Sequence, residues 1–364
     1  MDKLNKEINV LIPDGERVLA LFTINCLSML KNVKIHLLSK KKWTETRFSR
    51  KVRSFNYYTD VKTDEEWIEI IKKEIVKRKI NVLFPVEIED IRLLSEYRDD
   101  FEPFVPNLIL PSTDSFDISN NKWSLHNFLI KNNINSPTTV HIKDFNQLNL
   151  SELTFPVLLK PLVGMGGFGI KKVDNEASLK PFVQNDNNFI VQNIIKGFDI
   201  DVSVLCENGT ILAYTIQKGN IFSTALYSAP IGVEFLYNKE LFLMIKRLIE
   251  KMNWSGFAHI DLRYDESEGN FKVLEINPRV WGSIEASEKV GVNFPFLYCL
   301  SSLGINYDLP EYRFENFVNN IGLLKVLKSK IKKKTNKYQF PKNTLIENSI
   351  RNPLPILYKF FIKK

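Results

Sequence analysis

Two apolar stretches past the middle of the chain carry acidic and amide side chains at alternating positions. They are residues 258–264 and 271–279, and the turn-rich sequence DESEGN separates them. If the stretches pair about a turn centred near residue 268, Asp261 faces Glu275 and His259 faces Asn277. Carboxylates opposed at about 5 Å repel each other, and a hard cation such as Mg2+ would suit the oxygen ligands of Asp261, Glu275 and Asn277. The alternative interpretation is a solvated acidic hairpin without a metal.

A glycine-rich stretch lies earlier in the chain. Gly164, Gly166, Gly167 and Gly169 occur in the sequence GMGGFG, soon after the apolar run VLLKP that carries Lys160. The spacing fits G-x-G-x-x-G, but a strand-like stretch follows where a dinucleotide-binding turn would open a helix, and the Lys-Ser/Thr pair of a P-loop is missing. Glycines between two strands let backbone N–H groups approach phosphate oxygens. The sequence therefore predicts either a flap over a nucleotide or a flexible turn without a ligand.

Together these segments resemble the ATP-grasp superfamily, and in particular the ATP-grasp domain of carbamoyl-phosphate synthase large chains. The resemblance covers residues 119–304 and keeps the family's order of segments. It begins with Lys122 at the start of a helix and continues through Lys160, the glycine flap and the hinge segment 189–199. It ends with Asp261 and the sequence LEINPR at 274–279.

The resemblance implies a nucleotide site and a metal site. The nucleotide-binding residues that it implies are Lys122, Lys160, Gly164, Gly166, Gly167, Gly169, Gln192, Asn193, Ile194, Ile195 and Asp199. Asn193 and Asp199 depart from the family, which often has Glu at the first position and commonly has Glu at the second. The metal ligands implied are Asp261, Glu275 and Asn277, holding Mg2+ or Mn2+.

Most members of this family join a carboxylate to an amine through an acyl-phosphate, with release of ADP and phosphate. The resemblance implies that Lys122 and Lys160 balance the ATP phosphates, and that Arg279 stabilises the transferring phosphoryl group or the substrate carboxylate. Strand alternation places His259 and Arg263 on the face of Asp261, so both are candidate catalytic residues, although His259 could instead be a packed residue. The expected reactants are a small-molecule carboxylate and an amine.

Other functions stay open at this point. An ATP-grasp kinase or carboxylase would use the same nucleotide site with another acceptor, and a non-catalytic sensor would bind the nucleotide only. The sequence has no kinase catalytic loop and no Asp-Phe-Gly motif. Residues 218–233, rich in Gly, Ser and Thr, are expected to form a mobile lid or substrate loop.

The elements that position these residues follow from hydrophobic periodicity. Strands are expected at 8–12, 33–39 and 80–85, and helices at 17–30, 67–79 and 91–97. This pattern predicts a parallel sheet with crossover helices. A further helix over 119–132 would carry Lys122. Ligands of such sheets bind beyond the strand ends, so Asp14 to Glu16 and Pro85 to Glu87 form a candidate substrate rim, with helix capping as the alternative.

The expected fold class is α/β and α+β. An N-terminal Rossmann-like pre-ATP-grasp domain (1–118) precedes a two-subdomain ATP-grasp fold (119–308) and a basic C-terminal extension (309–364). The three cysteines, Cys26, Cys206 and Cys299, are far apart, which is typical of core residues in a reduced cytoplasmic protein. The uncharged stretch 18–30 is too short and too polar to span a bilayer.

The net charge of +8 is concentrated at the C-terminus. Residues 325–364 carry eleven Lys and one Arg against the single Glu347, a local charge of +11, which leaves −3 for residues 1–324. This distribution argues against a nucleic-acid groove. Leu324, Leu327 and Ile331 fall at helical spacing among lysines, so the tail could contact an anionic membrane surface, or it could be a solvated helix. Assembly into a homo-oligomer also stays open.

Overall fold

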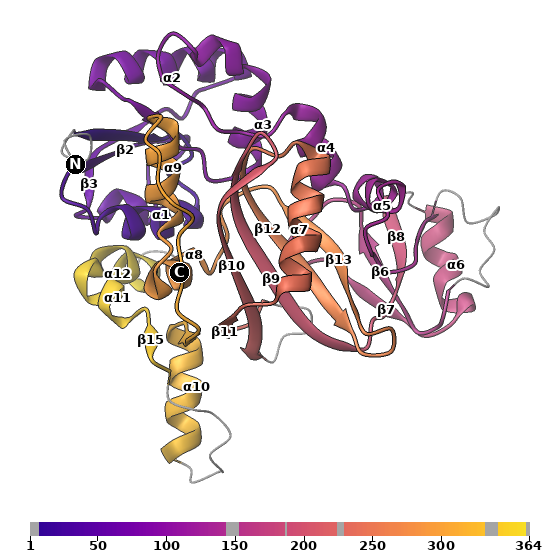
Figure 1. Ribbon diagram of the computed structural model, residues 1–364. Coiled ribbons are helices and arrows are strands. Elements are labelled where there is room, and N and C mark those ends of the chain that lie inside the picture. The colour runs from indigo at the N-terminus through magenta and orange to yellow at the C-terminus, as the bar shows by residue number, and fades with distance from the viewer. Residues whose placement is uncertain (1–6, 143–152, 186–187, 224–228, 332–340, 362–364) are drawn as a thin grey trace.

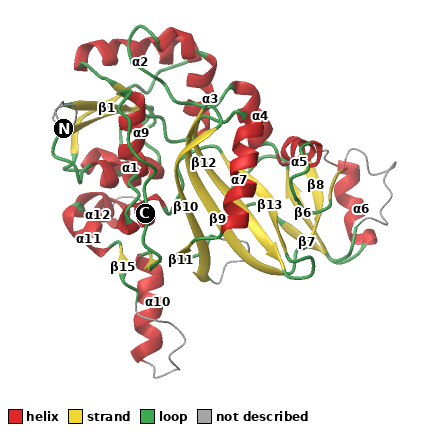
Figure 2. Ribbon diagram, in the orientation of Figure 1, coloured by secondary structure: helices red, strands yellow, loops and turns green. Residues whose placement is uncertain are grey.

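The computed structural model describes residues 7–142, 153–185, 188–223, 229–331 and 341–361 (Figures 1 and 2). Three sheets organise them: a four-stranded parallel sheet, a four-stranded antiparallel sheet and a seven-stranded sheet. In Figure 1 the seven-stranded sheet stands between the other two. The expected fold class, an α/β unit followed by α+β units, is confirmed.

The N-terminal sheet has the strand order β3-β2-β1-β4, and all of its pairs are parallel. Its elements are β1 (Ile8–Ile12), α1 (Val18–Leu27), β2 (Val33–Ser39), η2 (Thr46–Phe48), β3 (Val52–Tyr57), α2 (Asp64–Arg78), β4 (Val82–Leu83), α3 (Ile88–Glu96) and η3 (Arg98–Phe101). The predicted parallel sheet with crossover helices is therefore confirmed. The strand expected at 80–85 is shorter, and β3 has no counterpart among the expected strands because most of this edge strand is only half-buried.

The helix expected over 119–132 is two helices that meet at Asn121. They are α4 (Thr113–Asn120) and α5 (Lys122–Lys131). Asn121 has an extended backbone, and its side-chain oxygen accepts hydrogen bonds from the N–H groups of Trp123 and Ser124 at 3.0 and 3.1 Å. Asn121 is thus the N-cap of α5. This cap makes Lys122 the first residue of the helix, so its side chain leaves the helix at the end nearest the flap.

The small antiparallel sheet carries the glycine-rich loop and has its own core. Its strands are β5 (Thr139–His141), β6 (Val157–Pro161), β7 (Lys171–Val173) and β8 (Phe189–Asn193), in the order β5-β8-β6-β7, and α6 (Glu176–Asn185) follows β7. The buried residues are Val140, Ile142, Leu153, Val157, Leu159, Val173, Leu179 and Val191. This cluster contains no residue of the other two sheets.

The seven-stranded sheet has the order β13-β12-β9-β10-β11-β14-β15. Its first five strands in chain order are β9 (Gly197–Glu207), β10 (Thr210–Ile221), β11 (Gly232–Leu236), β12 (Gly256–Asp265) and β13 (Asn270–Asn277), and its helices are α7 (Lys239–Met252), α8 (Ile284–Val290) and α9 (Phe294–Ser302). The amphipathic helix α7 lies across the sheet in Figure 1 and buries Leu241, Ile245 and Leu248. Strands β10 and β11 occupy both ends of the loop expected at 218–233, and residues 224–228 lie outside the described residues.

One hydrophobic cluster joins the N-terminal sheet to the seven-stranded sheet. It includes Ile12 and Phe84 from the first sheet and Leu205, Phe257 and Trp281 from the second part of the chain. The ring centroids of Phe84 and Phe257 are 5.5 Å apart. These two sheets therefore share a continuous core.

The C-terminal extension is built into this framework. It contains β14 (Asn316–Val318), α10 (Asn320–Ile331), β15 (Asn343–Thr344), α11 (Ile346–Arg351) and α12 (Pro353–Phe361). Strand β14 pairs with β11, and β15 pairs with β14. Helix α12 reaches the N-terminal unit, where Tyr358 stacks on Phe48 with ring centroids 4.7 Å apart. The described part of the tail is therefore a structural element of the fold.

These contacts do not support the membrane interpretation of the tail, which stays a prediction. Helix α10 extends away from the body in Figure 1 and buries Leu323 and Val326. The expected apolar face is shifted by one residue from this buried face, and Leu324 and Leu327 are exposed. Among the described residues, no helix has the length and apolarity that crossing a bilayer requires.

A buried carboxyl group joins three separate parts of the chain. Glu285 on α8 is 2% exposed, and its Oε1 accepts hydrogen bonds from the amides of Asn25 on α1 at 2.9 Å and Asn348 on α11 at 2.6 Å. Asn352 extends the network by donating to Ser49 at 2.9 Å. Burial raises the pKa of Glu285 from 4.5 to about 7, although both amide hydrogen bonds oppose this shift.

This carboxyl should make stability depend on pH. The folded protein holds the proton of Glu285 more tightly than the unfolded chain does. The stability that the protonated Glu285 side chain contributes is therefore fully present below pH 4.5 and is lost as the pH rises through about 7. Glu285→Gln mimics the protonated carboxyl. It should leave the free energy of unfolding nearly unchanged at pH 4.5 and raise it at pH 8 by up to about 3 kcal/mol. Urea denaturation of both proteins at the two pH values measures this, and parallel pH dependence would contradict it.

Candidate functional site

The hairpin of β12 and β13 brings the predicted metal ligands together. Asp261 is paired with Glu275 and His259 with Asn277, which confirms the predicted register. The turn is centred slightly earlier than expected, since Asp265 pairs with Asn270, and an irregularity after Asp261 restores the expected pairing beyond it. The extra residue is a β-bulge beside the site. Asn277 also donates a 3.3 Å hydrogen bond to Asp261, so three oxygen-bearing side chains converge.

The pKa values of the two carboxyl groups of this hairpin are shifted in opposite directions. Partial burial and the charge of Glu275 raise the pKa of Asp261 well above its usual range. Burial also tends to raise the pKa of Glu275, but Lys122, at 3.0 Å from its Oε2, and the side chain of Asp261 lower it. The two carboxyl groups therefore disfavour each other's charge. A divalent cation between them would remove this conflict, which fits these residues as metal ligands.

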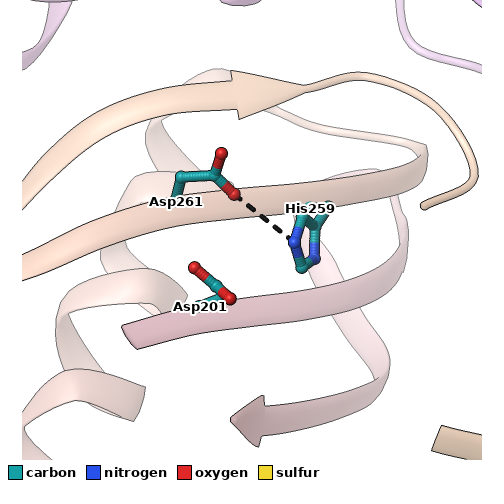
Figure 3. A group of neighbouring side chains, drawn as sticks. All are labelled: Asp201, His259 and Asp261. Carbon is teal, nitrogen blue, oxygen red and sulfur yellow. Dashed lines mark ion pairs between the residues drawn. The ribbon is translucent and has the colours of Figure 1, made fainter. Parts of the chain in front are cut away.

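A third acid, Asp201 on β9, was not among the expected site residues. It lies opposite Asp261 in the pairing of β9 with β12. Figure 3 shows Asp201, His259 and Asp261 facing one another, and one ligand atom of each lies within 4.8 Å of the others. Burial raises the pKa of Asp201 to about 7. The sequence signal that could have found Asp201 is its spacing of two residues from Asp199. Residues two apart on a strand point to the same face of the sheet.

His259 is a packed, neutral residue in this arrangement. Its Nε2 lies 3.4 Å from Asp261, its Nδ1 shares a 2.9 Å hydrogen bond with Ser203, and its ring stacks on Trp281 at 5.6 Å between centroids. Burial, followed by the charge of Arg279, lowers its pKa to about 3. The ring therefore orients its neighbours and is a poor proton donor near neutral pH, which favours the packed alternative over the catalytic one.

The two predicted phosphate-binding lysines are buried and close to the carboxylates. Lys122 is 9% exposed and contacts Glu275 and the carbonyl oxygen of Gly164, both at 3.0 Å. Lys160 is 6% exposed and donates to the Gln192 side chain at 2.6 Å. Burial lowers the pKa of Lys160 to about 8, and the charge of Lys122 lowers it further against the pull of Glu275. Two neighbouring ammonium groups that are shielded from water favour the binding of an anionic ligand.

The glycine-rich loop connects β6 to β7, which pair antiparallel. The backbone of Gly166, Gly167 and Gly169 is left-handed, with φ of 63, 76 and 78°, so side chains there would be strained. Phe168 at its tip is 88% exposed. The structure thus confirms a glycine-rich loop between two strands. That this loop covers a nucleotide stays a prediction.

The hinge segment is held in place by Arg263. Its guanidinium donates to the carbonyl oxygens of Ile195 at 2.7 Å and Gly197 at 2.8 Å, and it pairs with the carboxylate of Asp199. Arg263 was expected beside Asp261 as a catalytic candidate. The structure directs its side chain to the hinge, because the guanidinium there satisfies two backbone carbonyl groups and one carboxylate. Arg263 is therefore a positioning residue of the hinge.

The other hinge residues have distinct environments. Gln192 is buried between Lys160 and Thr139, to which its amide donates at 2.9 Å. Asn193 accepts a hydrogen bond from the N–H group of Thr154 at 2.9 Å. Ile195 is buried and Ile194 is exposed. Asp199 is paired with Arg263, so its predicted contact with the nucleotide would have to share that partner.

Arg279 lies between the metal-ligand triad and the N-terminal unit. Its guanidinium donates to Asn277 Oδ1 at 3.2 Å and to the carbonyl oxygen of Val280 at 2.7 Å, and it approaches the sulfur of Met165 in the flap at 3.6 Å. Its Nε is buried without a hydrogen-bond partner and lies 3.9 Å from Glu87. This side chain thus contacts or faces three different elements of the site.

Comparison with known proteins identifies the central part of the chain. A family model described as an ATP-grasp domain matches residues 119–283. The D-alanine–D-alanine ligase of Haemophilus influenzae is 26% identical over 144 residues, covering 36% of this chain and 48% of the ligase. The arginine-specific large chain of carbamoyl phosphate synthase from Bacillus subtilis is 22% identical over 150 residues, which cover 38% of this chain and 14% of that protein. The chain matches about half, or less, of the length of these relatives.

A likeness in fold extends over more of the chain. The structure of N5-carboxyaminoimidazole synthetase from Staphylococcus aureus complexed with ADP has a TM-score of 0.69 and 14% sequence identity. The match covers 91% of this chain and 87% of that one. The three sheets therefore form an arrangement already seen in solved structures.

The environment of His259 leads to a direct spectroscopic prediction. Because burial disfavours the imidazolium form and sets its pKa at about 3, the ring should stay neutral from pH 5 to 8. NMR of protein with labelled histidine, assigned with a His259→Asn variant, should show no titration of this ring in that interval. A titration near pH 6.5 would contradict the packed role and return His259 to the candidate proton-transfer residues.

Proposed function

Because residues 119–283 match the model of the ATP-grasp domain, we propose that this protein is an ATP-dependent ligase that joins a carboxylate to an amine and releases ADP and phosphate. One observation carries the proposal. Two buried ammonium groups, the facing carboxyl groups of Asp261 and Glu275, and the guanidinium of Arg279 converge where the flap meets the β12–β13 hairpin. Phosphoryl transfer requires such positioning and charge compensation more than covalent chemistry by the protein.

The nucleotide is ATP, and its phosphates lie against the lysines. Lys122 and Lys160 would exchange their present contacts with Glu275 and Gln192 for phosphate oxygens. The flap glycines would contribute backbone N–H groups, as expected from their left-handed conformation. The hinge from Gln192 to Asp199, clamped by Arg263, would receive the adenine and the ribose.

Asp261, Glu275 and Asn277 would hold Mg2+ or Mn2+. Their oxygen atoms are the ligand type that these ions prefer, and the mutual repulsion of the two carboxyl groups, seen in the raised pKa of Asp261, fits a site that gains a cation. When bound, the ion would neutralise negative charge on the phosphate groups. Asp201 lies close enough to Asp261 to orient it from the neighbouring strand.

The proposed reaction has two steps. A carboxylate oxygen of the first substrate forms a bond to the terminal phosphorus of ATP, and the bond from that phosphorus to ADP breaks. The amine nitrogen of the second substrate then attacks the acyl carbon, loses a proton and displaces phosphate. Arg279 would bind the carboxylate or the transferring phosphoryl group, because its planar guanidinium matches either anion.

Product analysis separates this proposal from a kinase or a sensor. Purified protein with Mg-ATP should be screened against small carboxylates, including amino acids, with and without amines. A ligase should release ADP and free phosphate in equal amounts only when a carboxylate and an amine are both present, and an amino acid given alone can supply both groups. ADP without free phosphate would indicate a kinase, and tight ATP binding without turnover across the panel would favour a sensor.

Glu275→Gln tests the metal assignment. The substitution removes a charge from the proposed Mg2+ site and deletes no packing volume, so turnover should fall on the order of a thousandfold with an unchanged thermal midpoint. Glu268→Gln is the matched control, because Glu268 lies in the turn of the same hairpin, is more than half exposed, and pairs with Lys272. Turnover of the Glu275 variant within a few-fold of the parent would remove Glu275 from the metal site.

A further inference from the structure

The loops that follow β1 and β4 are joined by a buried carboxyl group. Asp14 is fully buried, and its carboxyl accepts hydrogen bonds from the N–H groups of Val86 at 3.0 Å and Glu87 at 2.7 Å. These N–H groups belong to the two residues that precede the first residue of α3, Ile88. Asp14 therefore holds the chain just before α3 from a distant part of the sequence and fixes the backbone position of Glu87.

The side chain of Glu87 does not cap α3 and instead faces Arg279. Glu87 is the N-cap residue of α3, yet its side chain makes no capping hydrogen bond. Its Oε2 instead lies 3.9 Å from Nε of Arg279, and the two side chains are only 13 and 12% exposed. The distance exceeds that of a hydrogen bond, and the buried Nε of Arg279 has no hydrogen-bond partner. The two charges attract each other, but no hydrogen bond joins Glu87 to Nε of Arg279.

Arg279 also fixes where the reacting carboxylate would lie. Its guanidinium donates to Asn277, one of the proposed metal ligands, and its opposite side faces Glu87. A substrate carboxylate bound to Arg279 beside the metal would therefore present its α-carbon substituents near Glu87. The protein offers a cation and an anion side by side, which complements a ligand that carries an anion and a cation side by side.

We propose that Glu87 is a specificity-determining residue that binds the ammonium group of an α-amino acid, whose carboxylate is the group activated at Arg279. The inference rests on the proposed ligase function and names its carboxylate substrate class. In an α-amino acid two bonds separate the nitrogen from the carboxyl carbon, so the charges lie about 3 Å apart. That separation matches the neighbouring charges of Glu87 and Arg279. Longer ω-amino acids would carry the ammonium group past Glu87.

A neighbouring ion pair provides the internal control. Glu89 lies two residues after Glu87, in the first turn of α3. It pairs with Arg17 at 3.1 Å, and its side chain is 62% exposed. Its charge is already compensated and open to solvent. Glu89→Gln therefore removes one negative charge from the same region and acts on Glu87 only through the longer-range charges of Glu89 and Arg17, whereas Glu87→Gln removes the carboxylate that faces Arg279 itself.

The test follows the activated carboxylate directly. Full-length protein with Mg-ATP and hydroxylamine should be given each L- and D-amino acid and the matching des-amino acid, for example alanine and propionate. Hydroxylamine takes the place of the unidentified amine and converts an acyl-phosphate into a hydroxamate. At least one amino acid should give hydroxamate with a KM tenfold or more below that of its des-amino counterpart.

The variants then assign that preference. Glu87→Gln should raise KM for the amino acid about 10- to 100-fold, the range expected for a hydrogen bond to a charged group, and leave the des-amino acid within twofold. Glu89→Gln should change neither value. An equal loss on both substrates, or a parent enzyme that prefers des-amino acids, would overturn the role of Glu87 and leave the ligase proposal standing. Absence of hydroxamate from every carboxylate would overturn both.

Discussion

The ammonium group of Lys122 holds the two halves of the site together. It lies 3.0 Å from Glu275 in the seven-stranded sheet and 3.0 Å from the carbonyl oxygen of Gly164 in the flap of the small sheet. Its position depends on the Asn121 cap, which starts α5 at this residue, and on the hydrogen bond from the Lys122 N–H to Leu162 at 2.9 Å. This contact lowers the pKa of Glu275, whereas burial and the charge of Glu275 raise the pKa of Asp261. The local structure of one helix start thus influences the charges of the proposed metal ligands.

The remaining charges of the site are incompletely compensated. Lys160 and Asp201 have pKa values moved toward neutrality, to about 8 and about 7, chiefly by burial. Such shifts oppose folding stability and are typical of sites whose ligands supply the missing charges. Arg279 and Glu87 show the same pattern at the boundary with the N-terminal unit. A polyphosphate, a divalent cation and a zwitterion would each neutralise a different part of this arrangement.

Local patterns predicted the hairpin well, because its register depends only on strand alternation and one short turn. The parallel N-terminal sheet followed from periodic apolar segments for the same reason. Asp201 could not be placed, since the pairing of β9 with β12 joins strands that are distant in sequence. Arg263 lies on a strand whose pattern fixes the side-chain face but not the partner. The role of Asp14 in the expected substrate rim was equally hard to predict, because its partners are backbone N–H groups 72 and 73 residues away.

The tail shows a different limit of sequence patterns. Strands β14 and β15 are three and two residues long, too short for any periodic signal. In α10, residues 323 and 326 and residues 324 and 327 have the same helical spacing, so only tertiary contacts select the first pair as the buried face.

The separate core of the small sheet has a mechanical consequence. The N-terminal and seven-stranded sheets share one buried cluster, and the Glu285 network ties the tail to both. Helix α5 packs in the core of the seven-stranded sheet through Leu125 and Leu129. The small sheet is connected to these parts by residues 132–138 and 194–196, and Arg263 donates hydrogen bonds to the second connection. If the site opens and closes, we expect the small sheet and its flap to turn about these two connections, because no shared core among the described residues resists that movement.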